Sequence, residues 1–325
     1  MGKAMRKFIR LVSAAGTLAL SVLPAAAQYP SKPITLVVPY PPGGLIDLAA
    51  RIIQPKMQVE LGQPVVVENR SGAGGNVGAE AVVRASPNGY TLLLANPSLG
   101  ISPHIYPKLN YRPLADFAYI GLYGKTPNVL LVHPSLPVRS VRELIDYAKK
   151  NPGKLNYASN GYGTSPQMSM ELFKGMTGTF IVHIPFRGSG PATASLLANE
   201  TQLMFDNLPQ QVPLINGGRV RALAVTSLAR SPVMAELPTL DELGLKGFEV
   251  TSWFGLVAPA GTTREVVMRL NDALNRTTQD PQVHEALVSR GATVMQGTPE
   301  DFYNFVKGEI EKWGPIVKRA GVIAE

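Results

Sequence analysis

Two short glycine-containing loops hold the residues whose types and spacing suit ligand chemistry. Gly43 and Gly44 end a Pro/Gly loop between a β-branched apolar run, 34–38, and an amphipathic run that starts at Leu45. Glycine lets a backbone approach a ligand closely, and the unpaired N–H groups at a helix start attract anions. The pattern therefore predicts a buried strand, a loop and a helix, with an anion-accepting corner at Gly43-Gly44.

A second loop has the same arrangement. A predicted strand over 155–159 precedes it, and Ser165-Pro166 follows it as the predicted N-cap and first residue of a helix. The loop offers backbone N–H groups and neutral side chains from Asn160, Gly161, Gly163 and Thr164. The stretches 34–57 and 155–176 are not alike in sequence, so they form an architectural parallel and not a proven repeat. Two lobes with one such corner each would enclose a cleft.

Five further side chains are candidate ligand contacts. Ser98 offers a neutral hydroxyl. Tyr40 could line the cleft or pack. Asp47, in the first turn of its helix, could complement the helix dipole or contact the ligand. Arg187 could pair with a carboxylate or stay solvated, and Asp206 could bind a ligand amine or brace the hinge between lobes.

The elements that must position these residues alternate between strand and helix, which predicts an α/β fold with mostly parallel sheets flanked by helices. Further strands are predicted at 64–67, 90–95, 129–132, 181–186, 202–205, 220–225 and 254–257. Further helices are predicted at 141–150, with Ser140 as N-cap, and at 191–198. Three more are predicted to start at a capping box of Thr262 and Glu265, after Asp280, and at Thr298. Pro55 predicts a kink or an early end in the first helix.

Residues 1–27 have the features of a signal peptide. Four basic residues precede a 13-residue apolar segment, 11–23, and Ala25-Ala26-Ala27 suits cleavage. The segment is too short to span a bilayer, which takes about 20 residues. We therefore expect cleavage after Ala27 and a periplasmic protein. The chain has no cysteine, so neither a lipid anchor on cysteine nor a disulfide is possible.

Composition and motifs argue against several functions. The net charge of +8 becomes about +4 without the four basic residues of 1–27, and the remaining basic residues are scattered, so no nucleic-acid partner is expected. No G-x-S-x-G or H-E-x-x-H motif occurs, and no metal site is expected. Gly72, Gly74 and Gly78 depart from the dinucleotide-binding spacing, so no cofactor is expected. We interpret Gly74, Gly75 and Gly78 as positions that let a helix and a strand pack closely.

In combination, these residues resemble the Bug family, the periplasmic substrate-binding receptors of tripartite tricarboxylate transporters. The resemblance rests on 29–34, on 38–44 with Asp47, Ala50 and Arg51, and on 62–78, 157–164 and 183–188. It implies a two-lobed Venus-flytrap protein of type II, with lobe one at 28–127 plus 253–325 and lobe two at 128–252. The loops at 40–47 and 160–165 would contact a small carboxylate, partly through ordered waters. Gln167-Met168 departs from the His-Leu often found there.

The leading hypothesis is a non-catalytic, monomeric receptor that passes its ligand to a membrane permease. That ligand would be a di- or tricarboxylate, an aromatic acid or an acidic amino acid. One alternative is an exported enzyme that acts on carboxylates, although no set of nucleophile and base is evident. Another is a ligand sensor for a two-component kinase.

Overall fold

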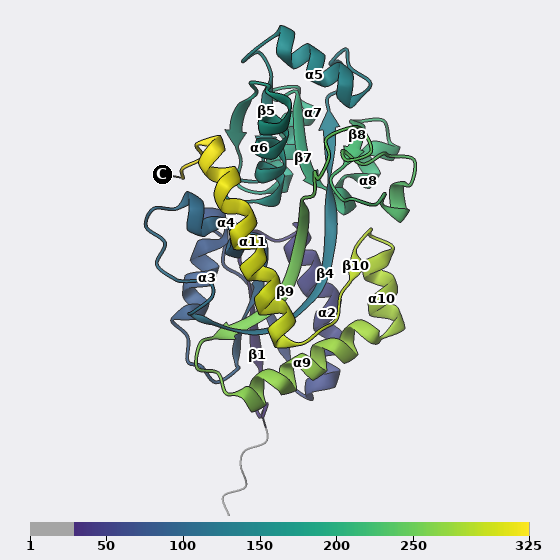
Figure 1. Cartoon of the computed structure of the whole chain (residues 1–325). Coiled ribbons are helices and arrows are strands. Elements are labelled where there is room, and N and C mark those ends of the chain that lie inside the picture. The colour runs from purple at the N-terminus through teal and green to yellow at the C-terminus, as the bar shows by residue number, and fades with distance from the viewer. Residues whose placement is uncertain (1–28, 325) are drawn as a thin grey trace, which may run out of the picture.

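A computed structural model of the protein describes residues 29–324, and the predicted signal peptide lies outside them. The chain forms two α/β lobes joined by long strands (Figure 1). The first lobe is built on β1 (Ile34–Val38), β2 (Val65–Asn69), β3 (Thr91–Ala95), β9 (Thr251–Pro259) and β10 (Thr293–Val294). The second is built on β5 (Asn156–Ser159), β6 (Val182–Pro185), β7 (Leu203–Asn207) and β8 (Arg221–Val225).

One strand belongs to both lobes. β4 (Phe117–Val132) pairs with β9 up to Pro127 and with β7 from Asn128 onward, both in antiparallel register. The strands are hydrogen-bonded in the order β2-β1-β3-β9-β4-β7-β5-β6, with β8 and β10 also on β4. The strand predicted at 129–132 is therefore the end of a much longer one, which carries the chain from lobe to lobe.

Within each lobe, the strands that lead to the ligand loops are parallel. β1 pairs in parallel with β2 and β3, and β5 pairs in parallel with β6 and β7. Both faces of β1 are covered, since Leu36 and Val38 pack in one apolar cluster and Val37 packs in another. This burial agrees with the uninterrupted apolar sequence of β1, which is typical of a parallel strand between two helical layers.

Helices flank both sheets (Figure 1). The first lobe carries α2 (Leu45–Leu61), α3 (Asn76–Val83), α4 (Ser98–Ile105), α9 (Arg264–Gln279) and α10 (Pro281–Val288). The second carries α5 (Val141–Lys150), α6 (Ser165–Thr177), α7 (Ser189–Leu197) and α8 (Leu208–Asn216). Short 3₁₀ turns occur at η1 (Ala73–Gly75) and η2 (Pro232–Met234). Between residues 29 and 324, no helix is both long enough and apolar enough to cross a membrane.

The last helix, α11 (Pro299–Ala320), packs against both lobes. It starts in the first lobe, where Phe302 and Val306 join an apolar cluster with Trp253. Near its end, Trp313 and Val317 pack in a cluster with second-lobe residues of β7 and α6. Figure 1 shows α11 running diagonally from one lobe to the other. This helix is therefore a third connection between the lobes, beside β4 and β9.

Several local predictions need correction. Pro55 does not end α2, which continues to Leu61, because buried Ile53 and Met57 hold the helix against the sheet while Pro55 faces solvent. The N-cap of α6 is Thr164 and not Ser165. α9 is capped by Thr263 and not Thr262, since the Thr263 hydroxyl accepts the N–H of Val266.

Other caps are confirmed. Ser140 accepts the N–H of Glu143, and Thr298 and Asp301 form a reciprocal capping box at the start of α11. The predicted helix at Asp280 is also confirmed, with Asp280 as the N-cap of α10. α8 and β10 lie where the sequence pattern predicted neither a helix nor a strand.

Replacing Trp313 by alanine tests whether the end of α11 contributes to the fold. The indole is 1% exposed and its Nε1 donates to Glu309, 3.2 Å away. We expect Trp313→Ala to lower the free energy of unfolding by about 3–5 kcal/mol, because a large buried side chain leaves a cavity. The measurement is urea unfolding, with Lys307→Ala on the exposed face of α11 as a control expected to stay within about 0.5 kcal/mol of the parent. Equal losses in both variants would contradict a packed end of α11.

Candidate ligand-binding site

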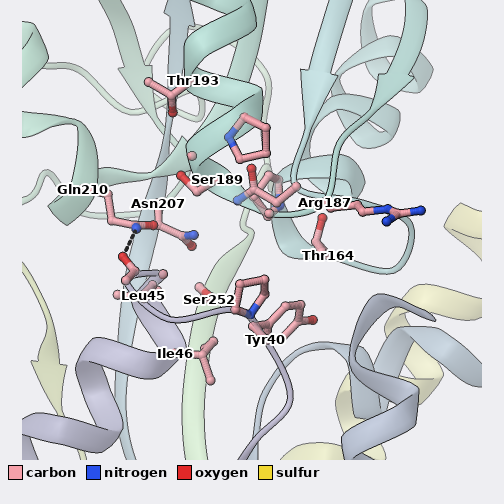
Figure 2. A pocket seen from close by; sticks show the side chains of 18 of the residues that line it. Tyr40, Leu45, Ile46, Thr164, Arg187, Ser189, Thr193, Asn207, Gln210 and Ser252 are labelled. Carbon is pink, nitrogen blue, oxygen red and sulfur yellow. Dashed lines mark hydrogen bonds between the residues drawn. The ribbon is translucent and has the colours of Figure 1, made fainter. Parts of the chain in front are cut away.

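A cavity of about 470 Å³ lies between the lobes and is lined from both. Its size suits a small molecule, since such sites span about 300–1,000 Å³. Figure 2 shows Tyr40, Leu45 and Ile46 from the first lobe facing Ser189, Thr193, Asn207 and Gln210 from the second. Gln210 crosses the gap, with its Nε2 donating to the carbonyl oxygen of Gly43 at 3.1 Å.

The first-lobe wall is the start of α2. Gly44 is the N-cap, with extended backbone at φ −76° and ψ 168°, and its carbonyl accepts the N–H of Leu48. Gly44, Leu45 and Ile46 line the cavity. Within the described chain, no hydrogen-bond acceptor is found for the N–H groups of these three residues. They are the free donors at a helix N-terminus that the sequence predicted.

Asp47 lies behind this wall and fixes the loop. Its carboxylate accepts the N–H of Gly43 at 3.0 Å, Nε of Arg51 at 2.9 Å and Nδ2 of Asn69 at 2.9 Å. Burial works to raise the pKa of Asp47, but the hydrogen bonds from Arg51, Gly43 and Asn69 outweigh it and hold the pKa below its ordinary value. Gly43 therefore offers its N–H to Asp47 and not to a ligand.

Three helices of the second lobe start at the same cavity. Thr164 and Ser165 at the start of α6, Ser189 at the start of α7 and Asn207 at the start of α8 all line it. The first-turn N–H groups of a helix have no partner within the helix. α2, α6, α7 and α8 thus start at one cavity, and each contributes a partial positive charge. α4 also starts there, at Pro97, but its first N–H groups, those of Ser98 and Leu99, donate to Asn96.

Asp206 is fully buried behind the second-lobe wall. Its carboxylate accepts Nδ2 of Asn160 at 2.7 Å, Nε2 of Gln211 at 2.6 Å and the hydroxyl of Ser189. All three donors line the cavity, whereas Asp206 does not. Burial raises the pKa of Asp206 even though these hydrogen bonds counteract it. Asp206 therefore sets the orientation of three wall residues.

The second glycine loop is held by its own hydrogen bonds. The N–H of Gly161 donates to the hydroxyl of Ser159, and the N–H of Gly163 donates to Oε1 of Gln167 at 2.8 Å. Ser159 also shares a 2.6 Å hydrogen bond with Nε2 of His183. Burial, with a smaller contribution from the positive charge of Lys174, lowers the pKa of His183 to about 4. The imidazole is thus neutral at physiological pH.

Of the twelve residues predicted from the sequence, seven line the cavity: Tyr40, Gly43, Gly44, Asn160, Thr164, Ser165 and Arg187. The other five do not, namely Asp47, Ser98, Gly161, Gly163 and Asp206. The two aspartates and two glycines are used in the loop hydrogen bonds described above. Ser98 is 2% exposed and begins α4, with its N–H donating to Oδ1 of Asn96.

The cavity lining is almost neutral. Arg187 is the one charged side chain among the described residues that line it, and Figure 2 shows its guanidinium pointing away from the neighbouring side chains. Within residues 29–324, no group of three or more His, Asp or Glu side chains is placed to hold a metal ion. The cavity can hold an anion through backbone N–H groups, hydroxyls and amides, without a full counter-charge.

Sequence interpretation missed seven polar wall residues, which are Asn96, Ser189, Thr193, Asn207, Gln210, Gln211 and Ser252. A signal was present for some of them. Asn207-Leu208-Pro209 is an N-cap followed by proline in the first turn, which is typical of a helix start. Ser252 carried no local signal, because only the pairing of β9 with β4 brings it to the cavity.

Two lobes joined by strands that run from one to the other, with an anion-accepting cavity between the lobes, define a two-lobed solute-binding protein of the periplasmic type. Family comparison then gives the particular group. The chain belongs to the tripartite tricarboxylate transporter family receptors (TctC), whose family model matches residues 49–322.

Individual relatives agree with this family. Protein BugT of Bordetella pertussis is 38% identical over 299 residues, covering 91% of this chain and 92% of BugT. The solved structure of R. palustris Rpa4515 with adipate is 37% identical with a TM-score of 0.86, covering 91% of this chain and 99% of that one. MatC from Rhodopseudomonas palustris with bound malate is 34% identical with a TM-score of 0.84, covering 89% and 100%.

The role of Asp47 in fixing the first loop can be tested through pH. A carboxyl whose pKa is lower in the folded state adds stability above its unfolded pKa, and this is lost as the pH falls through the folded pKa. We expect Asp47→Asn to lower the free energy of unfolding at neutral pH by about 1–3 kcal/mol, because charge-assisted hydrogen bonds are lost. The difference from the parent should shrink toward zero in acid.

The measurement is urea unfolding of both proteins across the acid range. Asp272→Asn, at an exposed position of α9, is the matched control and should show little difference at any pH. A loss in Asp47→Asn that does not change with pH would contradict a charged Asp47.

Proposed function

We propose that this protein is a periplasmic receptor that captures a small carboxylate between its lobes. The observation that carries the proposal is the convergence of the N-termini of α2, α6, α7 and α8 on one cavity with a nearly neutral lining. Free N–H groups at helix starts bind carboxylate oxygens well. A site without a full counter-charge also releases its ligand readily, as a transport receptor must.

The ligand we propose is an aliphatic dicarboxylate. Polar groups lie on both lobes, and the cavity between them is also lined by apolar side chains, including Leu45, Ile46, Leu197 and Leu214. A short methylene chain with a carboxylate at each end matches this distribution. The relatives whose structures contain adipate and malate support this ligand class.

We further propose that residues 1–27 are removed on export, and that the mature receptor acts as a monomer and delivers its ligand to a transporter permease. The lobe borders that we propose are those expected from the sequence, 28–127 plus 253–325 and 128–252. The change of β4 from pairing with β9 to pairing with β7 between Pro127 and Asn128 supports the first border. Membership of a transporter receptor family supports the permease as partner.

We propose binding without catalysis. Two serine–histidine pairs in the described chain resemble a nucleophile with a base: the exposed pair of Ser135 and His133, which does not line the cavity, and the pair of Ser159 and His183. The side chain of Ser159 is fully buried, its oxygen also accepts the N–H of Gly161, and neither residue lines the cavity. A bound ligand could not reach this hydroxyl, so the pair fixes the loop.

A thermal-shift screen tests the proposed ligand class. Adipate, malate, a tricarboxylate, an aromatic acid and an acidic amino acid are added to the mature protein. A carboxylate present at 100 times its dissociation constant should stabilise the protein by about 2.7 kcal/mol. Dimethyl adipate, with the same chain and no charge, is the matched control and should have no effect. Stabilisation by a neutral sugar, and by none of the carboxylates, would overturn the proposal.

Gly44→Val tests the corner at the start of α2. The backbone of Gly44 is in a region open to any residue, and a Cβ there would have only one neighbour, the carbonyl oxygen of Pro41 at 3.8 Å. We therefore expect a folded protein in which the valine side chain hinders ligand access to the free N–H groups. The dissociation constant, measured by calorimetry, should rise by about 100-fold or more, because two neutral hydrogen bonds to the ligand would be lost.

Gly308→Val, at an exposed position of α11 with no atom near its Cβ, is the control and should bind as the parent does. An unchanged dissociation constant in Gly44→Val would remove this corner from the site.

A further inference from the structure

We propose that the glycine-rich turn at 71–75 is a positioning element for ligand binding, because it forms a closing contact between the lobes at Gly74. The inference rests on the proposed receptor function, since it concerns how the two lobes hold a ligand. None of these five residues lines the cavity. The turn precedes α3 in the first lobe and contains η1.

Gly74 lies directly against the backbone of the second lobe. Its φ is +65°, and a Cβ atom at this position would collide with the carbonyl oxygen of Tyr162, in the second glycine loop. The same Cβ would lie 2.8 Å from the hydroxyl of Tyr106. Only a residue without a side chain permits this approach while the lobes are together.

The contact is linked to the cavity through Tyr40. The hydroxyl of Tyr40, which lines the cavity, donates to the carbonyl oxygen of Gly74 at 2.9 Å. Tyr162 belongs to the loop between Asn160 and Thr164, and its ring packs edge-on against His183 at 5.2 Å. The Gly74 contact therefore connects the two ligand loops behind the wall, in addition to the bond from Gln210 to Gly43.

Gly62 provides a matched control. It has nearly the same left-handed backbone, with φ +68° and ψ 16° against +65° and 19° for Gly74. No atom lies within 4 Å of a Cβ built on Gly62. Alanine at either position meets the same backbone strain, so a difference between the two variants reports the steric contacts of the new methyl group, with the Tyr162 backbone of the second lobe and the Tyr106 hydroxyl of the first.

The test compares Gly74→Ala with Gly62→Ala in the full mature chain. With adipate and malate as probes, we expect the dissociation constant of Gly74→Ala to be at least about tenfold higher than that of the parent, through faster dissociation. The reason is that the added methyl group overpacks the contact. Gly62→Ala should bind as the parent does. Equal affinity in the two variants would overturn the proposal.

A second measurement does not depend on the ligand. The chain has no cysteine, so spin labels on Val59→Cys and Leu228→Cys, exposed residues of different lobes, report the interlobe distance. Gly74→Ala should shift this distance to longer values without ligand, and Gly62→Ala should not. Identical distances would count against the contact. If neither probe binds the parent, the receptor proposal fails, but the distance comparison still decides the role of Gly74.

A third measurement uses the parent sequence, in case Gly74→Ala does not fold. Hydrogen exchange is followed for the amides of 71–75 and 161–163, with adipate and without it. Slower exchange in 71–75 on ligand addition is expected, although this turn does not line the cavity. Unchanged exchange there would show that ligand binding does not engage the turn.

Discussion

The N–H groups at the start of a helix need an acceptor, and this requirement organises the ligand site. α2, α6, α7 and α8 each follow a parallel strand, β1, β5, β6 and β7 respectively. Parallel strands end at one edge of a sheet, so the helices that follow them start at that edge as well. Because β4 belongs to both sheets, the starts of α2 and of the three second-lobe helices meet across one gap. The candidate anion site is thus a consequence of topology and needs no positively charged side chain at its centre.

Negative charge is placed behind the site and not in it. Asp47 and Asp206 are buried, and each carboxylate accepts hydrogen bonds from groups that shape a cavity wall. A buried carboxylate needs such donors, because an unpaired charge away from water is costly. The consequence is a division of tasks. Donors such as the N–H of Gly43 hold the loops rigid, and the N–H groups of Leu45 and Ile46, which have no partner in the described chain, remain for a ligand.

The sequence was sufficient where a local pattern is also the physical cause. The apolar run of β1, the glycines before α2 and the capping box of α11 each predict what the structure contains. It was insufficient where distant contacts decide. Gly121, Gly124 and Pro127 interrupt the strand pattern of β4, yet pairing with β9 keeps the strand continuous across all three. At the cavity, the two glycine-containing loops predicted from the sequence contribute Gly43, Gly44, Asn160 and Thr164 to the wall. Which N–H groups stay free, however, depends on side chains four residues after the glycines. Asp47 accepts the N–H of Gly43, and Gln167 accepts the N–H of Gly163.

Glycines that look alike in the sequence therefore act differently. Gly44 borders the open cavity, whereas Gly74 lies against the opposite lobe. A ligand that binds the closed state gains its affinity from contacts in the cavity. Its apparent affinity is lowered when only a fraction of the protein is closed without ligand. Because the donors at the site are neutral, each contact contributes modestly. The contacts between lobes then determine a substantial part of the affinity, so residues that never touch the ligand can tune how tightly it is held.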